Sequence, residues 1–174
     1  MEKIFGNLEG RIRCYSGLEI NLINPTEDMI DIRDIARGLA YKGHFGGQTP
    51  EFFSIAQHCI LVCNLMEDDF KDNNDMMLLG LLHDASEAYL GDMVKPLKVH
   101  LPRFQEIEHN LMQVICNKFN LRCSDIEQLK KYDIEAQKIE FRTFYMEEGG
   151  ITHFMETNKA YEVFLEKYKL LNGA

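Results

Sequence analysis

The fold of this 174-residue chain is decided by the stretch Met76-Met77-Leu78-Leu79-Gly80-Leu81-Leu82-His83-Asp84-Ala85-Ser86-Glu87-Ala88-Tyr89-Leu90. The stretch is strongly apolar and shows no strand-like alternation, so it predicts a buried helix that ends at Gly91. The doublet His83-Asp84 interrupts the apolar run. Burying an ionised carboxylate beside an imidazole costs several kcal/mol unless a counter-charge or a metal compensates it. The doublet is therefore the first candidate for a functional site.

Helical spacing directs three side chains of this stretch toward one point. Adjacent helical residues point about 100° apart, so a cation between His83 and Asp84 could contact both. Glu87 follows His83 by four residues and Asp84 by three, on the same face. His58 lies in another apolar segment, and helix packing could bring it to the same place. A lone histidine of this kind can also be an ordinary core residue, and spacing leaves that alternative open.

The remaining sequence predicts one mostly helical domain over residues 1–174, with a β-hairpin in residues 1–26 and a helical core in residues 27–174. The strands of the hairpin are Arg11–Tyr15 and Glu19–Ile23, around the turn pair Ser16-Gly17. Helix-start signals predict one helix from Thr26 through Ala40 and another, opened by Pro50, over Glu51–Met66. Further helices are expected over Arg103–Phe119, Asp125–Glu147 and Met155–Leu171, with a charged loop over Asp68–Asp75 and Gly149-Gly150 before the last helix.

Composition excludes several classes of protein. The chain has 19 basic and 28 acidic residues and a net charge of −9, which disfavours binding to duplex nucleic acid. Hydrophobic residues make up 45%, so wholesale disorder is excluded. No segment approaches the roughly 20 apolar residues of a membrane helix, and no secretory signal is recognisable. We therefore expect a cytoplasmic protein that makes no membrane contact.

The five cysteines are expected to be reduced thiols that fill core space. Their number is odd, and no Cys-x-x-Cys pair occurs. Because structural zinc sites normally show such paired spacing, a zinc–cysteine site is disfavoured.

His58, the doublet His83-Asp84 and Asp133 together resemble the His … His-Asp … Asp signature of the HD superfamily of metal-dependent phosphohydrolases. The run from His83 to Lys98, His-Asp-Ala-Ser-Glu-x-x-x-Gly-Asp-x-x-x-Pro-x-Lys, is similar to the bacterial 5′-deoxynucleotidase branch. That branch includes phage-encoded relatives that act on deoxynucleoside triphosphates. The resemblance spans roughly Ile30 to Glu140.

The resemblance implies an all-α HD-domain helical fold behind the short hairpin. It implies an enzyme that hydrolyses phosphoester bonds of a small-molecule deoxynucleotide, as a 5′-deoxynucleotidase or a deoxynucleoside triphosphate phosphohydrolase. The expected location is the cytoplasm, which is that of the host if the chain is phage-encoded. Because related proteins assemble as dimers or larger rings, a homo-oligomer is expected as well.

The resemblance also implies one divalent cation held by His58, His83, Asp84 and a downstream aspartate. Asp125 and Asp133 are both available. We expect Asp133, because its segment and the following Glu140 resemble the Asp … Glu helix of the family. The apolar neighbours of Asp133 suggest a buried side of that helix: Ile134, Ile139 and Phe141. Asp125 follows Ser124 at a predicted helix start, where a capping carboxylate is the ordinary explanation.

The chemistry of these donors narrows the choice of metal. Two imidazoles and two carboxylates form a mixed nitrogen and oxygen set. Such a set suits Mn²⁺, Fe²⁺, Co²⁺ or Zn²⁺ better than Ca²⁺ or Mg²⁺. The sequence does not choose among the four metals.

By the same resemblance, Glu87 and Asp92 are the expected catalytic carboxylates. One would orient or deprotonate a water, and the other would protonate the leaving oxygen. The sequence does not assign the two roles. Each residue also has an ordinary alternative, as a solvated helix residue and a turn residue.

The implied substrate contacts lie on either side of this motif. Lys98 is the expected phosphate contact and Lys95 a second one, although either lysine could simply be solvated. His44-Phe45 stands where the family has an arginine followed by an aromatic residue. His44 in place of arginine weakens the expected phosphate clamp. Phe45 can still stack on a base, or serve as a loop anchor.

A nucleotide-binding regulatory HD protein with little turnover is the alternative function. A purely structural helical module would leave His83-Asp84 unexplained. The Gly-Tyr-Pro signature of cyclic-dinucleotide hydrolases is absent, and the sequence flanking the motif does not match stringent-response hydrolases. Base preference and the number of phosphates removed stay open.

Overall fold

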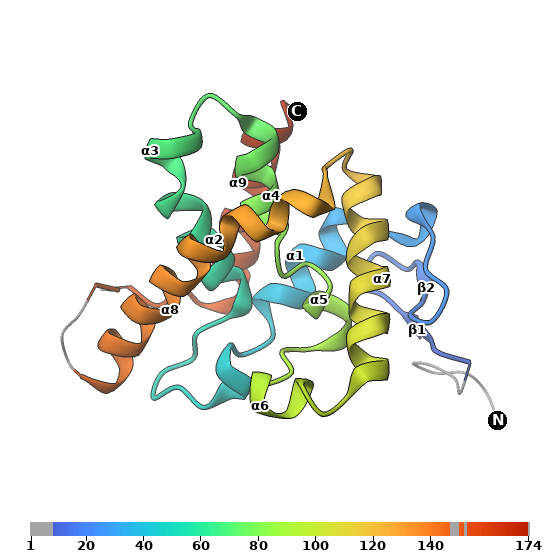
Figure 1. Ribbon diagram of the computed structural model, residues 1–174, viewed down its shortest axis with the longest axis horizontal. Helices are drawn as coiled ribbons and strands as arrows, with labels where there is room; N and C mark the ends of the chain where they lie inside the picture. Colours follow the sequence, from blue (N-terminus) through green and yellow to red (C-terminus); the bar gives the residue numbers. More distant parts are fainter. Residues whose placement is uncertain (1–8, 147–149, 152, 174) are drawn as a thin grey trace.

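The computed structural model describes residues 9–146, 150–151 and 153–173. It confirms a mostly helical fold with a short N-terminal hairpin (Figure 1). Strands β1 (Arg11–Arg13) and β2 (Glu19–Asn21) pair antiparallel. The α-helices are α1 (Ile32–Ala40), α2 (Ile55–Leu65), α3 (Glu67–Phe70), α4 (Asn74–Leu82), α5 (Glu87–Leu90), α6 (Lys95–Lys98), α7 (Pro102–Lys118), α8 (Lys130–Tyr145) and α9 (Thr157–Asn172). Short 3-10 helices are η1 (Glu27–Met29), η2 (Phe45–Gly47) and η3 (Cys123–Leu129). The predicted helix end at Glu147 and the predicted break at Gly149 lie outside the described residues.

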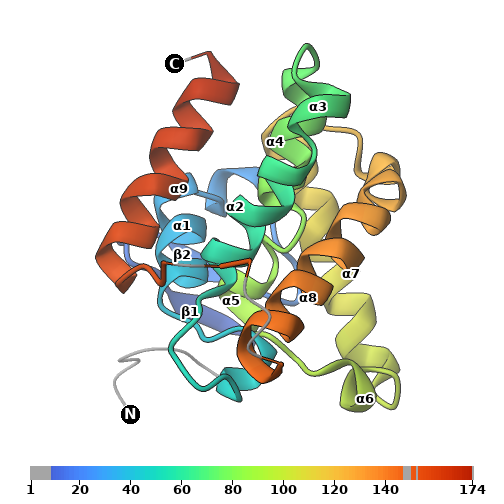
Figure 2. The same ribbon diagram turned by 90° about the vertical axis from the view of Figure 1, so that its left-hand side faces the viewer.

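Helices α2 and α4 form the centre of the molecule. Both are apolar nearly all round, as expected for helices that are covered on several sides. Helix α2 packs on α4 and α8, α4 packs on α9, and α1 packs on both α9 and α5. Figure 2 shows α9 along one side of this core and α7 along the other. No helix in the described ranges has the length and apolar character of a membrane span.

The hairpin is fastened to the helical core through its turn. The backbone N–H and the hydroxyl of Ser16 both donate to the carboxylate of Asp34 on α1, each at 2.6 Å. Gly17 has φ +93°, a conformation that glycine adopts without steric cost. The predicted turn pair is thus correct, while the strands are shorter than predicted.

Two predicted helix starts are wrong. The helix expected from Thr26 begins at Ile32, where Asp31 accepts a hydrogen bond from the N–H of Arg33 at 2.8 Å. The hydroxyl of Thr26 instead donates to Asp28. The helix expected after Pro50 begins at Ile55, behind Ser54. The Ser54 side chain accepts from the N–H of Gln57 at 3.2 Å, in a capping box that the sequence already contains.

The predicted continuous helix from Met76 to Leu90 is also wrong. Helix α4 ends at Leu82, the chain turns, and α5 starts at Glu87. The Nζ of Lys42 donates to the carbonyl oxygens of Glu87 and Ala88, at 3.0 and 2.5 Å. A long-range lysine therefore satisfies carbonyls at the end of α5, which local periodicity cannot reveal.

Two smaller corrections follow. The charged segment predicted as a loop over Asp68–Asp75 contains the short helix α3. The helix predicted from Asp125 is preceded by η3, and α8 begins at Lys130.

Candidate metal centre

The turn after α4 holds His83 and Asp84. The Nδ1 of His83 lies 2.8 Å from the carbonyl oxygen of Gly80, a contact that fixes the ring. The Nε2 of His83 then faces Asp84 Oδ2 at 3.2 Å. The expectation that this doublet directs both groups to one point agrees with the geometry, although it does so from a turn and not from a helix.

Helices α2 and α8 bring the other two predicted ligands. His58 on α2 is completely buried, and its Nε2 lies 3.7 Å from Asp84 Oδ2 and 3.2 Å from Asp133 Oδ1. Donor atoms of His58, His83 and Asp84 lie within 4.8 Å of one another and could hold a metal ion. Asp133 adjoins this group through His58.

The electrostatics of this group fit a cation. Although they face carboxylates, the Nε2 atoms of His58 and His83 are buried and lack a hydrogen-bond partner in the described part of the chain. Burial would lower the pKa of His83, but Asp84 outweighs it and raises that pKa well above the ordinary value. Burial would likewise lower the pKa of His58, but Asp133 and Glu140 outweigh this effect and raise that pKa. The carboxylates thus require positive charge, which either ring protons or a divalent cation would supply.

Glu140 orients His58 from behind. Its Oε1 lies 2.7 Å from the Nδ1 of His58, and both side chains are fully buried. Burial would raise the pKa of Glu140, but His44 and His58 lower it to about 2. Carboxylates that hold the second nitrogen of a metal-binding histidine fix its tautomer and ring orientation. The sequence signal for this role of Glu140 is its position two turns after Asp133, which indicates the same face of the helix.

The environment of the two competing aspartates differs from the prediction. Ile134 and Phe141, expected to mark a buried side, are exposed. The buried side chains of α8 are Tyr132, Ala136, Glu140 and Phe144. Asp125 lies in η3, where it pairs with Arg122 at 2.9 Å and accepts from Gln128 at 3.1 Å. The prediction that Asp125 caps a helix is therefore wrong.

Glu87 and Asp92 experience opposite electrostatic environments. Burial, reinforced by Asp84 and Asp92, raises the pKa of Glu87 to about 9. Burial also acts to raise the pKa of Asp92, but contacts with His44 and the N–H of Gly46 lower it below the ordinary value. Glu87 thus favours the protonated form and Asp92 the ionised form. Such a pair of separated pKa values is typical of acid and base partners.

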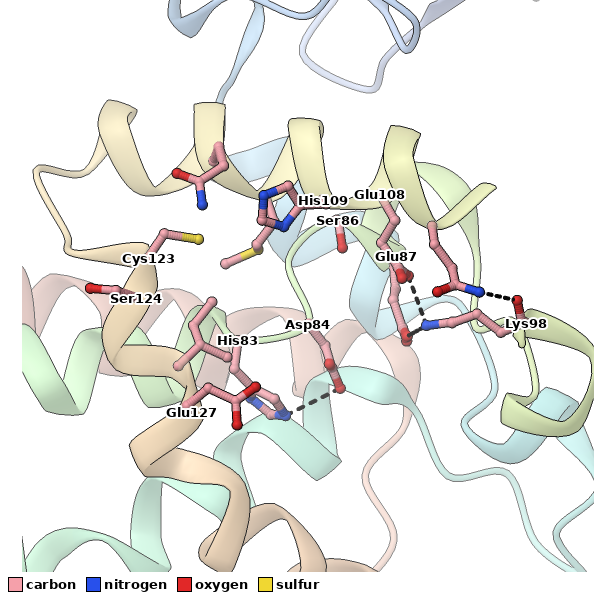
Figure 3. A pocket seen from close by; sticks show the side chains of 14 residues that line it. His83, Asp84, Ser86, Glu87, Lys98, Glu108, His109, Cys123, Ser124 and Glu127 are labelled. Carbon is pink, nitrogen blue, oxygen red and sulfur yellow. Dashed lines mark hydrogen bonds and ion pairs between the residues drawn. The ribbon is translucent and has the colours of Figure 1, made fainter. Parts of the chain in front are cut away.

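Two cavities meet beside these groups, and both are lined by Asp84, Glu87 and Lys98. One, of about 580 Å³, opens between the turn after α4, helix α7 and η3 (Figure 3). The other, of about 520 Å³, is lined by the segments that carry His44 and Asp92 and by α8. The candidate centre is therefore accessible from two directions.

The predicted substrate contacts line the second cavity, and they differ in exposure, ion pairing and backbone conformation. Lys98 is paired, with its Nζ 2.8 Å from Glu108 Oε1 and 3.6 Å from Glu87 Oε1. Lys95 is exposed and has no ion pair within 4 Å among the described residues. Phe45 is half-buried with φ +54°, a left-handed conformation that is uncommon for a non-glycine residue.

His44 lines the same cavity, but its ring nitrogens face protein carboxylates. Nδ1 lies 3.5 Å from Asp92 Oδ2, and Nε2 lies 3.4 Å from Glu140 Oε2. Burial would lower the pKa of His44, yet the two carboxylates raise it to about 10. In this arrangement, the His44 ring therefore interacts chiefly with the carboxylates of Asp92 and Glu140.

Fold and site together define a helical protein with a buried histidine–carboxylate cluster that could hold a metal ion. The chain is 31% identical over 153 residues to Uncharacterized protein YfdR of Escherichia coli (strain K12), which covers 88% of this chain and 83% of that protein. It belongs to the same family as YfdR. Uncharacterized protein RCAP_rcc00048 of Rhodobacter capsulatus is 36% identical over 117 residues, or 63% of this chain and 58% of that protein. A scan of family models finds no match.

Proposed function

We propose that the chain is an HD-type metal-dependent phosphohydrolase that cleaves a phosphoester bond of a deoxynucleotide. It would act as a 5′-deoxynucleotidase or as a deoxynucleoside triphosphate phosphohydrolase. The observation that carries the proposal is the grouping of His58, His83 and Asp84, whose donor atoms could hold a metal ion, with Asp133 Oδ1 3.2 Å from the Nε2 of His58. The motif from His83 to Lys98 supports the substrate class by resemblance.

These four residues would hold one divalent transition metal, Mn²⁺, Fe²⁺, Co²⁺ or Zn²⁺. When bound, such a cation supplies Lewis-acid charge to a phosphate oxygen and to a water. The ring orientation of His58 would be set by Glu140, and that of His83 by the carbonyl of Gly80. The chain thus fixes the direction of both imidazoles before a cation arrives.

Proton transfer is assigned to the two carboxylates beside this cluster. Asp92, held ionised, would orient the attacking water and accept its proton. Glu87, whose raised pKa keeps it protonated near neutral pH, would donate a proton to the leaving oxygen. Both carboxylates line the cavity that also contains Asp84, so both would lie near the scissile phosphate.

The nucleotide would occupy the cavity lined by Phe45, Lys95 and Lys98. Lys98 would turn from Glu108 toward a phosphate, and Lys95 would add a second positive charge. The Phe45 ring offers a face for the nucleoside, since base–aromatic stacking tolerates any base. This small number of cations suits a small nucleotide better than a long polyanion. A homo-oligomer stays a prediction.

Phosphate or polyphosphate release from a panel of deoxynucleoside mono- and triphosphates tests the proposal. Reactions contain Mn²⁺ or Co²⁺ and are repeated after EDTA. Metal-dependent release that is lost in Asp84→Ala supports it. Tight nucleotide binding without product under any metal would favour the alternative, a regulatory nucleotide-binding protein.

A further inference from the structure

His44 lies between two carboxylates that belong to different parts of the fold. Its Nδ1 faces Asp92 Oδ2 at 3.5 Å, and its Nε2 faces Glu140 Oε2 at 3.4 Å. These distances exceed those of well-formed hydrogen bonds, and with a protonated imidazole the contacts are ion pairs. The side chain is 9% exposed, and both nitrogens lack another partner among the described residues.

The contacts of His44 continue to the candidate metal centre. Glu140 Oε1 lies 2.7 Å from the Nδ1 of His58, and the rings of His44 and His58 stack with centroids 4.3 Å apart. An unbroken path of contacts therefore runs from Asp92 through His44 and Glu140 to His58. It joins the segment after α5, the segment before η2, and helices α8 and α2.

Asp92 depends on long-range contacts for its position. It follows Gly91, whose φ of +87° ends α5, and it lies in an irregular segment before α6. Its Oδ2 accepts from the N–H of Gly46 at 3.1 Å, in the same loop as His44. That loop is itself anchored, because the N–H of His44 donates to the carbonyl of Phe53 at 2.8 Å. His44 and Gly46 thus approach one carboxylate oxygen from an anchored loop.

We propose that His44 is a positioning residue and not a substrate contact. It holds Asp92 beside the metal centre by linking that carboxylate, through Glu140, to His58. The inference rests on the proposed function, in which Asp92 acts on the attacking water. The nearest competing arrangement is a second cation held by His44, His58 and Glu140, whose donor atoms also lie within 4.8 Å of one another. It would require the imidazole of His58 to bridge two cations, because the opposite nitrogen already faces Asp84 and Asp133.

Kinetics of single and double variants test this role. In His44→Ala, kcat should fall by about 100-fold while KM changes little, since small misplacements of a catalytic group are costly. In an Asp92→Asn background, the same change should cause little further loss, because residues that act through one another are not additive. Gln48→Ala, in the same loop, is the matched control. A raised KM with unchanged kcat, or losses that multiply, would overturn the proposal.

Hydrogen exchange tests the same link without relying on activity. The Gly46 amide should exchange faster in both His44→Ala and Asp92→Asn, and residues 91–94 should exchange faster in His44→Ala. His44→Gln replaces the alanine variant if the latter does not fold. Unchanged exchange would overturn the proposal even if the wild type released no phosphate, an outcome that would separately contradict the proposed function. Two metals in the wild type and one in His44→Ala would establish the second-cation arrangement instead.

Discussion

The Nδ1 of His58 lies 2.7 Å from Oε1 of Glu140, and neither side chain reaches solvent. This contact determines which nitrogen of His58 is available to Asp84 and Asp133. Replacing Glu140 by glutamine should therefore lower metal affinity by roughly 10- to 100-fold, the usual effect of losing such a partner. Metal titration monitored by calorimetry measures the change.

Glu135→Gln provides the matched control for that substitution. Glu135 lies on the same helix and forms a surface ion pair with Lys138, at 3.1 Å. Metal affinity should stay at the wild-type value in this control. Equal affinities in Glu140→Gln and Glu135→Gln would contradict the orienting role of Glu140.

The fourth ligand is tested by the two aspartates that compete in the sequence. Asp133→Asn should sharply weaken metal binding, because Asp133 Oδ1 lies 3.2 Å from the Nε2 of His58. Asp125→Asn should retain metal and turnover. Its loss removes a pair with the exposed Arg122, a kind of contact that contributes at most about 1 kcal/mol to stability. Metal content, activity and thermal unfolding of both variants separate the cases, and metal loss in Asp125→Asn alone would reverse the assignment.

Metal affinity should increase with pH. The pKa values of His58 and His83 are raised by their carboxylate neighbours in the metal-free protein, so both rings hold their protons to higher pH than a free imidazole does. A cation must displace these protons, and fewer need displacing as pH rises toward the raised pKa values. Calorimetry in buffers of different ionisation enthalpy should show proton release upon metal binding. His100→Ala, which removes an exposed histidine, should leave that release unchanged. Affinity independent of pH between about 6 and 8 would contradict the expected competition.

The start of α2 shows what the sequence could have predicted. Ser54 and Gln57 form a capping box at the start of α2, whereas Pro50, the predicted start signal, lies before it. Ser54→Ala should therefore lower the free energy of unfolding by about 1 kcal/mol, as measured by urea denaturation. Thr26→Ala should cost much less, because the Thr26 side chain caps no helix. Similar losses in both variants would contradict this reading of the caps.

The structure brings His58, His83, Asp84 and Asp133 close together, as spacing and resemblance suggest, whereas several predicted helix bounds around them are wrong. His83-Asp84 stood out because a buried charge needs compensation, and that argument does not depend on whether the doublet lies in a helix. The end of α5 involves Lys42, which is far away in sequence and donates to the carbonyls of Glu87 and Ala88. The contact of His44 with Asp92 and Glu140 likewise arises from packing of separate segments. Local sequence patterns do not reveal contacts between segments that are distant in the chain.

Glu87 should be required for turnover and not for metal binding. It is buried and is 3.6 Å from Lys98, and the raised pKa of about 9 lets it carry the proton that a leaving oxygen needs. Glu87→Gln keeps the shape of the side chain but cannot donate an acidic proton. The kcat should therefore fall by about 10²- to 10⁴-fold while metal content stays at the wild-type value.

Glu106→Gln, an exposed change on α7 that removes a pair with Arg103, should leave both quantities unaltered. Wild-type activity should itself decline as pH rises through about 9, because the donor loses its proton there. Full turnover in Glu87→Gln would remove Glu87 from the proposed reaction, and loss of metal in that variant would make it a ligand instead.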